Sequence, residues 1–220
     1  MENDLDQALR YLGAGPASGE LREQVGEVLA RLEAQIQPRY TYRIVPLERR
    51  GGGFGLEGTG IVLPGRLAGR MLEDCGQAAL LACTLGAAFD QRLSALQARD
   101  MAQAVIWDAC GSALVERGCG QAEEELAGRF PGLFFTDRFS PGYGDLPLDL
   151  QPALCAALDT PRRLGLYVTP SLLLNPVKSV TAVIGLSERP QPARVRGCAY
   201  CQMREHCPYR KGGTHCGEQI

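Results

Sequence analysis

Apolar residues recur along the chain with two different periods, and these periods outline its elements. Val25, Val28, Leu32 and Ile36 lie three or four positions apart, which is the spacing of one face of an α-helix. Short runs rich in β-branched and aromatic residues are typical of strands instead. We expect helices over 2–12, 18–37, 67–74, 87–96, 151–158 and from about residue 100, and strands over 40–47, 59–63, 77–84, 133–137, 164–169 and 179–185.

Helices placed irregularly between strands favour an α+β fold. We predict a single domain over 1–186, built on a twisted, largely antiparallel sheet that is flanked by helices. The strands over 77–84 and 133–137 are expected to be buried, because both are almost wholly apolar. A linker over 187–197 follows, and a small cysteine-rich tail occupies 198–220.

Composition narrows the class of protein. Of the 220 residues, 45% are hydrophobic and 22% are charged, as in ordinary soluble globular proteins. The net charge of −2 gives no polybasic signal for nucleic acid or a membrane surface, and no apolar run reaches the about 18 residues of a transmembrane helix. The first residues lack the features of a signal peptide. We therefore expect a cytoplasmic protein that binds neither nucleic acid nor a membrane.

A glycine-rich segment over 51–58 carries a motif of nucleotide-binding loops. Gly53, Gly55 and Gly58 satisfy the pattern G-x-G-x-x-G. In a dinucleotide fold this loop must open a helix whose N-terminus meets the phosphates, whereas a predicted strand follows here. We interpret the segment as a glycine-rich hairpin.

Four of the nine cysteines lie within the last 23 residues and form a candidate metal site. Their spacing is Cys198-x2-Cys201-x5-Cys207-x8-Cys216, and both histidines of the chain directly precede one of them. Cysteines in a cytoplasmic protein indicate a metal or redox role more than disulfides. The spacing leaves open an iron–sulfur cluster or redox-active thiols, structural zinc, and a disordered or disulfide-bonded tail.

The remaining cysteines with apolar neighbours indicate core packing. Cys83, Cys110 and Cys155 lie in apolar runs, where a thiol behaves as a small hydrophobic residue. Asp108 adjoins one of these runs, so it is either an exposed carboxylate or one that faces a pocket.

The segment Arg138–Leu148, RFSPGYGDLPL, is the main candidate for a binding site. Pro141 pre-sets φ and Gly142 accepts a positive φ, so the pair suits the central positions of a type II turn. That turn would bring Arg138 and Tyr143 towards one mouth, and an arginine can grip a carboxylate by two parallel hydrogen bonds. The alternative is a surface turn with a solvated arginine and a packed tyrosine.

This segment contains Arg-x-x-x-Gly-Tyr and resembles the reactivation domain of cobalamin-dependent methionine synthase, which binds S-adenosylmethionine. The longer form is more similar to short stand-alone members of that family, as are Asn175-Pro-Val-Lys-Ser-Val-Thr-Ala182 and Ala8-Leu-Arg-Tyr-Leu-Gly13. The resemblance spans residues from about 8 to 186. The large enzyme has Gly-Tyr-Pro-Ala-Cys-Pro where this chain has Gly-Tyr-Gly-Asp-Leu-Pro, and it lacks the cysteine-rich tail.

The resemblance implies a role in methionine biosynthesis, namely the reductive reactivation of methionine synthase from its cob(II)alamin state. Arg138 would pair with the carboxylate of S-adenosylmethionine, and Ser140, Pro141 and Gly142 would contact the same ligand. Tyr143 would lie between the sulfonium and the cobalt as the catalytic residue. Lys178 is either an exposed lysine or a second cation of this binding site.

The cobalamin is expected on a partner, because neither histidine fits the Asp-x-His-x-x-Gly pattern of proteins that bind it base-off. That partner would be methionine synthase or another corrinoid protein, with flavodoxin or ferredoxin as electron donor. Two other functions stay open. One is a corrinoid-protein activator that transfers electrons through an iron–sulfur cluster without S-adenosylmethionine. The other is a non-catalytic adaptor of methionine synthase.

Overall fold

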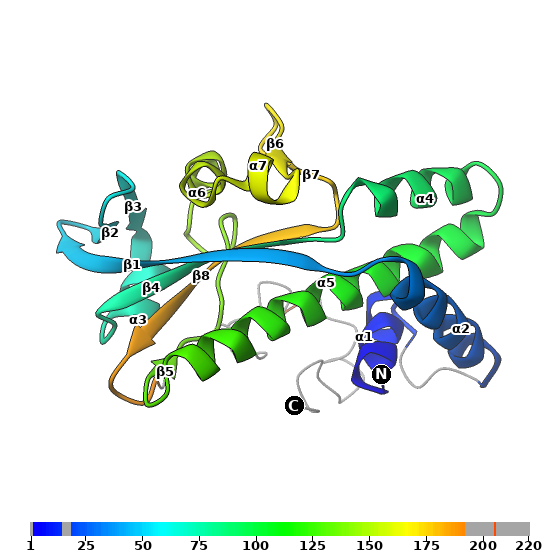
Figure 1. Ribbon diagram of the computed structural model, residues 1–220, viewed down its shortest axis with the longest axis horizontal. Coiled ribbons are helices and arrows are strands. Elements are labelled where there is room, and N and C mark those ends of the chain that lie inside the picture. Colours follow the sequence, from blue (N-terminus) through cyan, green and yellow to red (C-terminus); the bar gives the residue numbers. More distant parts are fainter. Residues whose placement is uncertain (1, 15–18, 192–204, 206–220) are drawn as a thin grey trace. The chain divides into compact units, whose positions relative to one another are not determined.

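The computed structural model describes residues 2–14, 19–191 and 205 (Figure 1). These residues form two compact units. The first unit comprises Met1–Thr41, Ala82–Glu123 and Asp159–Val180, and the second comprises Tyr42–Leu81, Glu124–Leu158 and Thr181–Ile220. Each unit is therefore assembled from segments that are far apart in the sequence.

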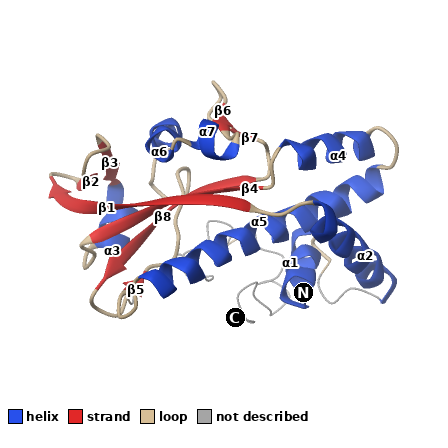
Figure 2. Ribbon diagram, viewed as in Figure 1, coloured by secondary structure: helices blue, strands red, loops and turns tan. Residues whose placement is uncertain are grey.

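The described part of the chain has an α+β fold, which confirms the predicted class (Figure 2). Its helices are α1 (Glu2–Tyr11), α2 (Gly19–Gln35), α3 (Gly65–Leu72), α4 (Ala87–Gln97), α5 (Met101–Arg129), α6 (Gln151–Leu158) and α7 (Thr160–Leu164), with a 3-10 turn at Leu148–Leu150. Its strands are β1 (Arg39–Arg50), β2 (Gly53–Leu56), β3 (Ile61–Pro64), β4 (Gln77–Thr84), β5 (Phe134–Phe135), β6 (Tyr167–Val168), β7 (Leu174–Asn175) and β8 (Ser179–Ser187). Six strands form a largely antiparallel sheet in the order β3-β2-β1-β4-β8-β5.

In the first unit, ion pairs join α1 to α2 and to the segment of α5 that belongs to this unit. Arg117 of α5 donates to Asp4 of α1 at 3.1 Å and also to Glu33 of α2, and Arg22 donates to Asp6 at 2.7 Å. The apolar stripe predicted over 18–37 is confirmed, since its central residues are buried, namely Val25, Val28, Leu29, Leu32 and Ile36.

The strand predicted over 164–169 is wrong in its extent and in the sheet to which it belongs. Leu164 ends the short helix α7, because Gly165 follows it at φ 65°, a left-handed backbone that ends a helix. Only Tyr167 and Val168 are extended, and they pair with β7 in a separate two-stranded sheet. The two buried residues of this run are Leu164, which ends α7, and Leu166, which lies between α7 and β6, so neither belongs to the strand.

The second unit contains the glycine-rich hairpin. Strand β2 pairs with β1 from Leu47↔Leu56 to Arg50↔Gly53, and its other edge pairs with β3. The glycine-rich segment therefore leads into a further strand and not into a helix, which confirms the hairpin interpretation over the dinucleotide-binding one. Helix α3 packs on β2 and β3 with its apolar face buried, namely Leu67, Ala68, Met71 and Leu72.

The prediction of a buried strand over 133–137 is wrong in its burial and length. Only Phe134 and Phe135 are paired, with β8, and Phe134 is 43% exposed. The reason is position, because β5 is the last strand in the order of the sheet and an edge strand is covered on fewer sides. Thr136 is the buried residue of this segment, at 5% exposure.

Two absences apply only to the residues that the structure describes. No helix among them is long and apolar enough to cross a membrane. They also contain no group of three or more metal-binding side chains. The predicted metal ligands Cys198, Cys201, Cys207 and Cys216 lie outside the described residues.

Candidate functional site

The RFSPGYGDLPL segment is held to strand β8 in the second unit. Thr136 and Gly185 exchange two hydrogen bonds, from the Thr136 N–H to the Gly185 carbonyl at 3.0 Å and from the Gly185 N–H to the Thr136 hydroxyl at 2.8 Å. The backbones of Phe139 and Val183 exchange two more, at 3.0 and 2.8 Å. Arg138 therefore directly precedes a residue, Phe139, whose backbone is hydrogen-bonded to β8. Arg138 itself is half-buried.

The predicted type II turn is confirmed by its hydrogen bond and its glycine. The Tyr143 N–H donates to the Ser140 carbonyl at 3.1 Å. Pro141 is buried and Gly142 is exposed at φ 84°, a left-handed backbone that favours glycine at this position. Tyr143 is half-buried directly after the turn.

A second turn closes the loop on itself. The Leu146 N–H donates to the Tyr143 carbonyl at 3.1 Å, and the Gly142 N–H donates to the Leu146 carbonyl at 2.9 Å. Leu146 is buried at 2% exposure, so the loop has an apolar anchor of its own. The backbone from Ser140 to Leu146 is thus fixed by hydrogen bonds within the loop.

Asp145 attaches this loop to α3. Its carboxylate accepts the backbone N–H of Leu67 at 2.9 Å and that of Arg66 at 2.7 Å, which are donors in the first turn of a helix that have no partner within it. These two hydrogen bonds lower the pKa of the Asp145 carboxyl below its usual range, and the one from Leu67 has the larger effect. The nearby Arg66 guanidinium lowers this pKa further. Gly65 leaves room for this contact, because a Cβ there would lie 2.9 Å from the Asp145 carboxyl carbon.

The sequence did not predict this role of Asp145. Each of the two segments carries a signal for it. Helix α3 begins after Pro64 and has no Ser, Thr, Asp or Asn as its own N-cap. Asp145 is the acidic residue of the predicted binding loop. The two segments are far apart in the sequence, so only the fold shows that one caps the other.

Lys178 belongs to the first unit, where it is paired. Its ammonium group lies 2.9 Å from a carboxylate oxygen of Asp108 and 2.8 Å from the Ser112 hydroxyl, and its side chain is only 14% exposed. The interpretation as an exposed lysine is therefore wrong. Its proposed place beside Arg138 stays a prediction, since Arg138 belongs to the second unit.

Asp108 faces a pocket, which was one of the two alternatives predicted for it. Together with Ser112 it lines a hollow of about 270 Å³ in the first unit, whose other walls include Tyr11, Met101 and Val105. The Asp108 side chain is 46% exposed. The carboxylate therefore meets both solvent and the Lys178 ammonium.

The prediction of core cysteines is confirmed. Cys83, Cys110 and Cys155 are buried at 0%, 0% and 4% exposure. Burial, with a smaller effect of Glu33, raises the pKa of the Cys110 thiol to about 12. This thiol is therefore protonated at neutral pH and has no nucleophilic character there.

Comparisons with known proteins give a match at the level of the fold. No protein-family model matches the sequence, and no curated protein matches it. Among solved structures, the chain is similar to one described as the MetH reactivation domain bound to AdoHcy, with a TM-score of 0.59 and 17% sequence identity. The match covers 89% of this chain and 72% of that one. The chain therefore shares the fold of the MetH reactivation domain, as its motifs predicted.

Proposed function

We propose that this chain supports the reductive reactivation of a cobalamin-dependent methionine synthase. In this proposal it binds S-adenosylmethionine and presents it to cob(II)alamin carried by the partner. The observation that carries the proposal is the fold shared with the MetH reactivation domain, whose solved structure contains AdoHcy. AdoHcy, S-adenosylhomocysteine, is what remains of S-adenosylmethionine after its methyl group has been transferred.

The RFSPGYGDLPL loop supplies suitable groups for such a ligand. Arg138 offers a guanidinium beside the backbone bridge at Phe139, and an arginine forms two parallel hydrogen bonds with a carboxylate. The exposed glycine of the turn, Gly142, lets the main chain approach a ligand closely. Tyr143 follows the turn with a ring and a hydroxyl, which we assign to the space between the sulfonium and the corrin.

The proposed reaction requires one electron, which a separate donor protein supplies. A donor protein reduces cob(II)alamin by one electron to cob(I)alamin. The cobalt of cob(I)alamin then attacks the methyl carbon of S-adenosylmethionine and forms a cobalt–carbon bond. The carbon–sulfur bond breaks, its electron pair stays on sulfur, and S-adenosylhomocysteine leaves. The cofactors carry this chemistry, and the protein contributes binding and orientation.

Titration calorimetry of the purified chain with S-adenosylmethionine, under anaerobic conditions, tests the proposal directly. Arg138→Ala removes a charged hydrogen-bonding partner of the carboxylate, so binding should weaken by about 1.5–3 kcal/mol, or about 10- to 150-fold. Arg99→Ala is the matched control, because Arg99 is an exposed arginine of the first unit, and it should bind as the wild type does. Equal affinities for wild type and Arg138→Ala would remove Arg138 from the site.

The cysteine-rich tail favours a second candidate function, an activator of corrinoid proteins that transfers an electron through an iron–sulfur cluster. The specific observation is the spacing of Cys198, Cys201, Cys207 and Cys216, since four thiolates are the usual ligands of such a cluster. Iron and sulfide in the anaerobically purified chain, without any heat of binding for S-adenosylmethionine, would favour this function over the first.

A further inference from the structure

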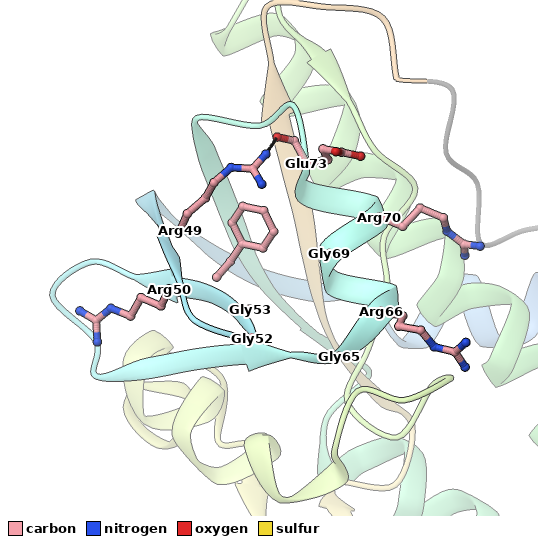
Figure 3. Close-up of a pocket in the computed structure, with 10 residues that line it drawn as sticks. Arg49, Arg50, Gly52, Gly53, Gly65, Arg66, Gly69, Arg70 and Glu73 are labelled. Atoms are coloured by element: carbon pink, nitrogen blue, oxygen red, sulfur yellow. Dashed lines mark hydrogen bonds between the residues drawn. The ribbon is translucent and has the colours of Figure 1, made fainter.

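A hollow of about 500 Å³ lies in the second unit between the β1–β2 hairpin and α3 (Figure 3). This volume is within the usual range of small-molecule sites. Its walls carry four arginines against a single glutamate, namely Arg49, Arg50, Arg66, Arg70 and Glu73. Such an excess of positive charge is local, because the whole chain has a net charge of −2.

Arg49 is the arginine held in place at this hollow. Its guanidinium donates to the backbone carbonyl of Glu73 at 2.5 Å and lies 5.3 Å from the centre of the Phe54 ring. Phe54 is buried at 4% exposure, so the guanidinium rests on a rigid apolar surface. The contact with a neutral carbonyl leaves the positive charge of Arg49 available to an anion.

The other three arginines stand at the rim. Figure 3 shows Arg66 and Arg70 projecting from α3 and Arg50 projecting from the hairpin. Arg50 pairs with Glu48 at 3.0 Å, and Arg66 is fully exposed with Asp145 3.9 Å away. In Figure 3 their guanidinium groups extend away from Arg49, so they add positive charge around the hollow and Arg49 is the arginine that faces a ligand.

Four glycines line the same hollow, and three of them are required by the backbone. Gly52 and Gly65 have φ values of 89° and 92°, and a Cβ at Gly53 would lie 2.2 Å from the Leu63 carbonyl oxygen. Gly69 is different, because it lies inside α3 and a Cβ there would meet nothing within 4 Å.

Neither close packing nor a left-handed backbone explains Gly69. Glycine is less favourable than alanine inside a helix, so its use here has a cost in stability. What it leaves is open space on the wall of the arginine-lined hollow. Gly26 and Gly120 are also helical glycines with nothing within 4 Å of a Cβ, so what distinguishes Gly69 is its place on the wall of this hollow.

From the anchored Arg49, the cationic rim and the open wall at Gly69, we propose that this hollow binds a small molecule carrying a phosphate or diphosphate group. Guanidinium groups match the geometry of phosphate oxygens, and several of them favour a multiply charged anion. The inference is independent of the proposed function, because the hollow is formed by other residues than those assigned to S-adenosylmethionine.

Inorganic pyrophosphate is the probe, measured by titration calorimetry of the full chain at low ionic strength. We expect saturable binding of one equivalent. Gly69→Leu places a side chain in the hollow and should weaken binding at least about tenfold, and Arg49→Gln should do the same by removing the anchored charge. Gly26→Leu is the matched control, because Gly26 is also a helical glycine with nothing within 4 Å, and it should bind as the wild type does.

Each alternative result overturns the proposal. If Gly69→Leu binds pyrophosphate as tightly as wild type while Arg49→Gln does not, the anion is held by surface charge alone and not in the hollow. If binding is not saturable, there is no site. Circular dichroism verifies that each variant is folded, and Gly69→Ala replaces Gly69→Leu if the larger residue prevents folding, with a smaller loss expected.

Discussion

At the scale of single residues, Asp145 connects two segments that the sequence separates widely. Its carboxylate satisfies two N–H groups at the start of α3, and it lies in the loop that carries Arg138 and Tyr143. The same contact therefore stabilises the helix and positions the candidate site. A negative charge is also favourable here because of the helix dipole.

Removal of this carboxylate should lower the stability of the second unit. In Asp145→Ala the N–H groups of Arg66 and Leu67 lose their acceptor, and we expect the Tm at pH 7 to fall by about 2–4 °C. The folded-state pKa of Asp145 is lowered. Its contribution is therefore present above the unfolded pKa of about 3.9 and is lost as the pH falls through the lower folded value.

Chemical denaturation of wild type and variant across a pH series measures this difference. Asp149→Ala is the control, because Asp149 is an exposed carboxylate four residues further along the chain, and it should leave stability nearly unchanged. A gap between wild type and Asp145→Ala that persists unchanged at pH 2 would show that the charge of Asp145 is not responsible.

The part of the site that the sequence could predict is the part formed by residues adjacent in the chain. The turn at Pro141–Gly142 follows from two adjacent residues with restricted or permissive backbones, so no other part of the chain is needed to infer it. The capping by Asp145 and the pairing of Lys178 with Asp108 depend on residues brought together by folding. Periodicity and turn propensity carry no information on such distant partners.

At the scale of elements, length decided which predictions succeeded. Strand β4 and helix α5 extend over many residues with a steady pattern. The prediction gave both bounds of β4 and the start of α5 correctly to within one residue. Strands β5 and β6 have two residues each, too few for a period to be read. Their apolar residues resembled longer strands, and the one over 133–137 was also expected to be buried, although burial depends on neighbouring elements and not on the apolar run itself.

The packing of α5 in the first unit depends on a glycine. A Cβ at Gly118 would lie 2.5 Å from the Pro38 Cβ and 2.8 Å from the Cys83 sulfur, so Gly118→Ala forces α5 away from these neighbours. We expect a loss of about 1–3 kcal/mol in the free energy of unfolding, as for other overpacked cores. Urea denaturation of the variant gives this value.

Gly120, two positions further along α5, is the matched control. A Cβ at Gly120 would meet nothing within 4 Å, so Gly120→Ala should stabilise the chain by about 0.5–1 kcal/mol through helix propensity alone. The opposite signs of the two substitutions separate packing from propensity. A Gly118→Ala variant as stable as Gly120→Ala would contradict the close packing.

At the scale of the whole molecule, the order of elements predicted the α+β class, and the structure adds a division into two compact units. Each of the two units draws on three separate segments, and β1, β4, β8 and α5 contribute residues to both. A boundary inside an element leaves no change in composition, no proline-rich linker and no break in periodicity. Composition, linkers and periodicity therefore carry no information on which segments belong to which unit.

Binding of S-adenosylmethionine to the folded chain alone should raise its thermal stability. A ligand at about 100 times its Kd adds about 2.7 kcal/mol to the free energy of unfolding, which for a chain of this size corresponds to a rise in Tm of about 5–10 °C. Arg138→Ala should lose most of this rise at the same ligand concentration, because its weaker affinity lowers the occupancy. Arg99→Ala should keep it, and its own Tm without ligand should match that of the wild type.

Thermal unfolding with and without S-adenosylmethionine separates two effects of the Arg138 substitution. Loss of folding lowers the Tm in both conditions. Loss of the ligand contact lowers it only when the ligand is present. An identical rise for all three proteins would place the binding site away from the RFSPGYGDLPL loop.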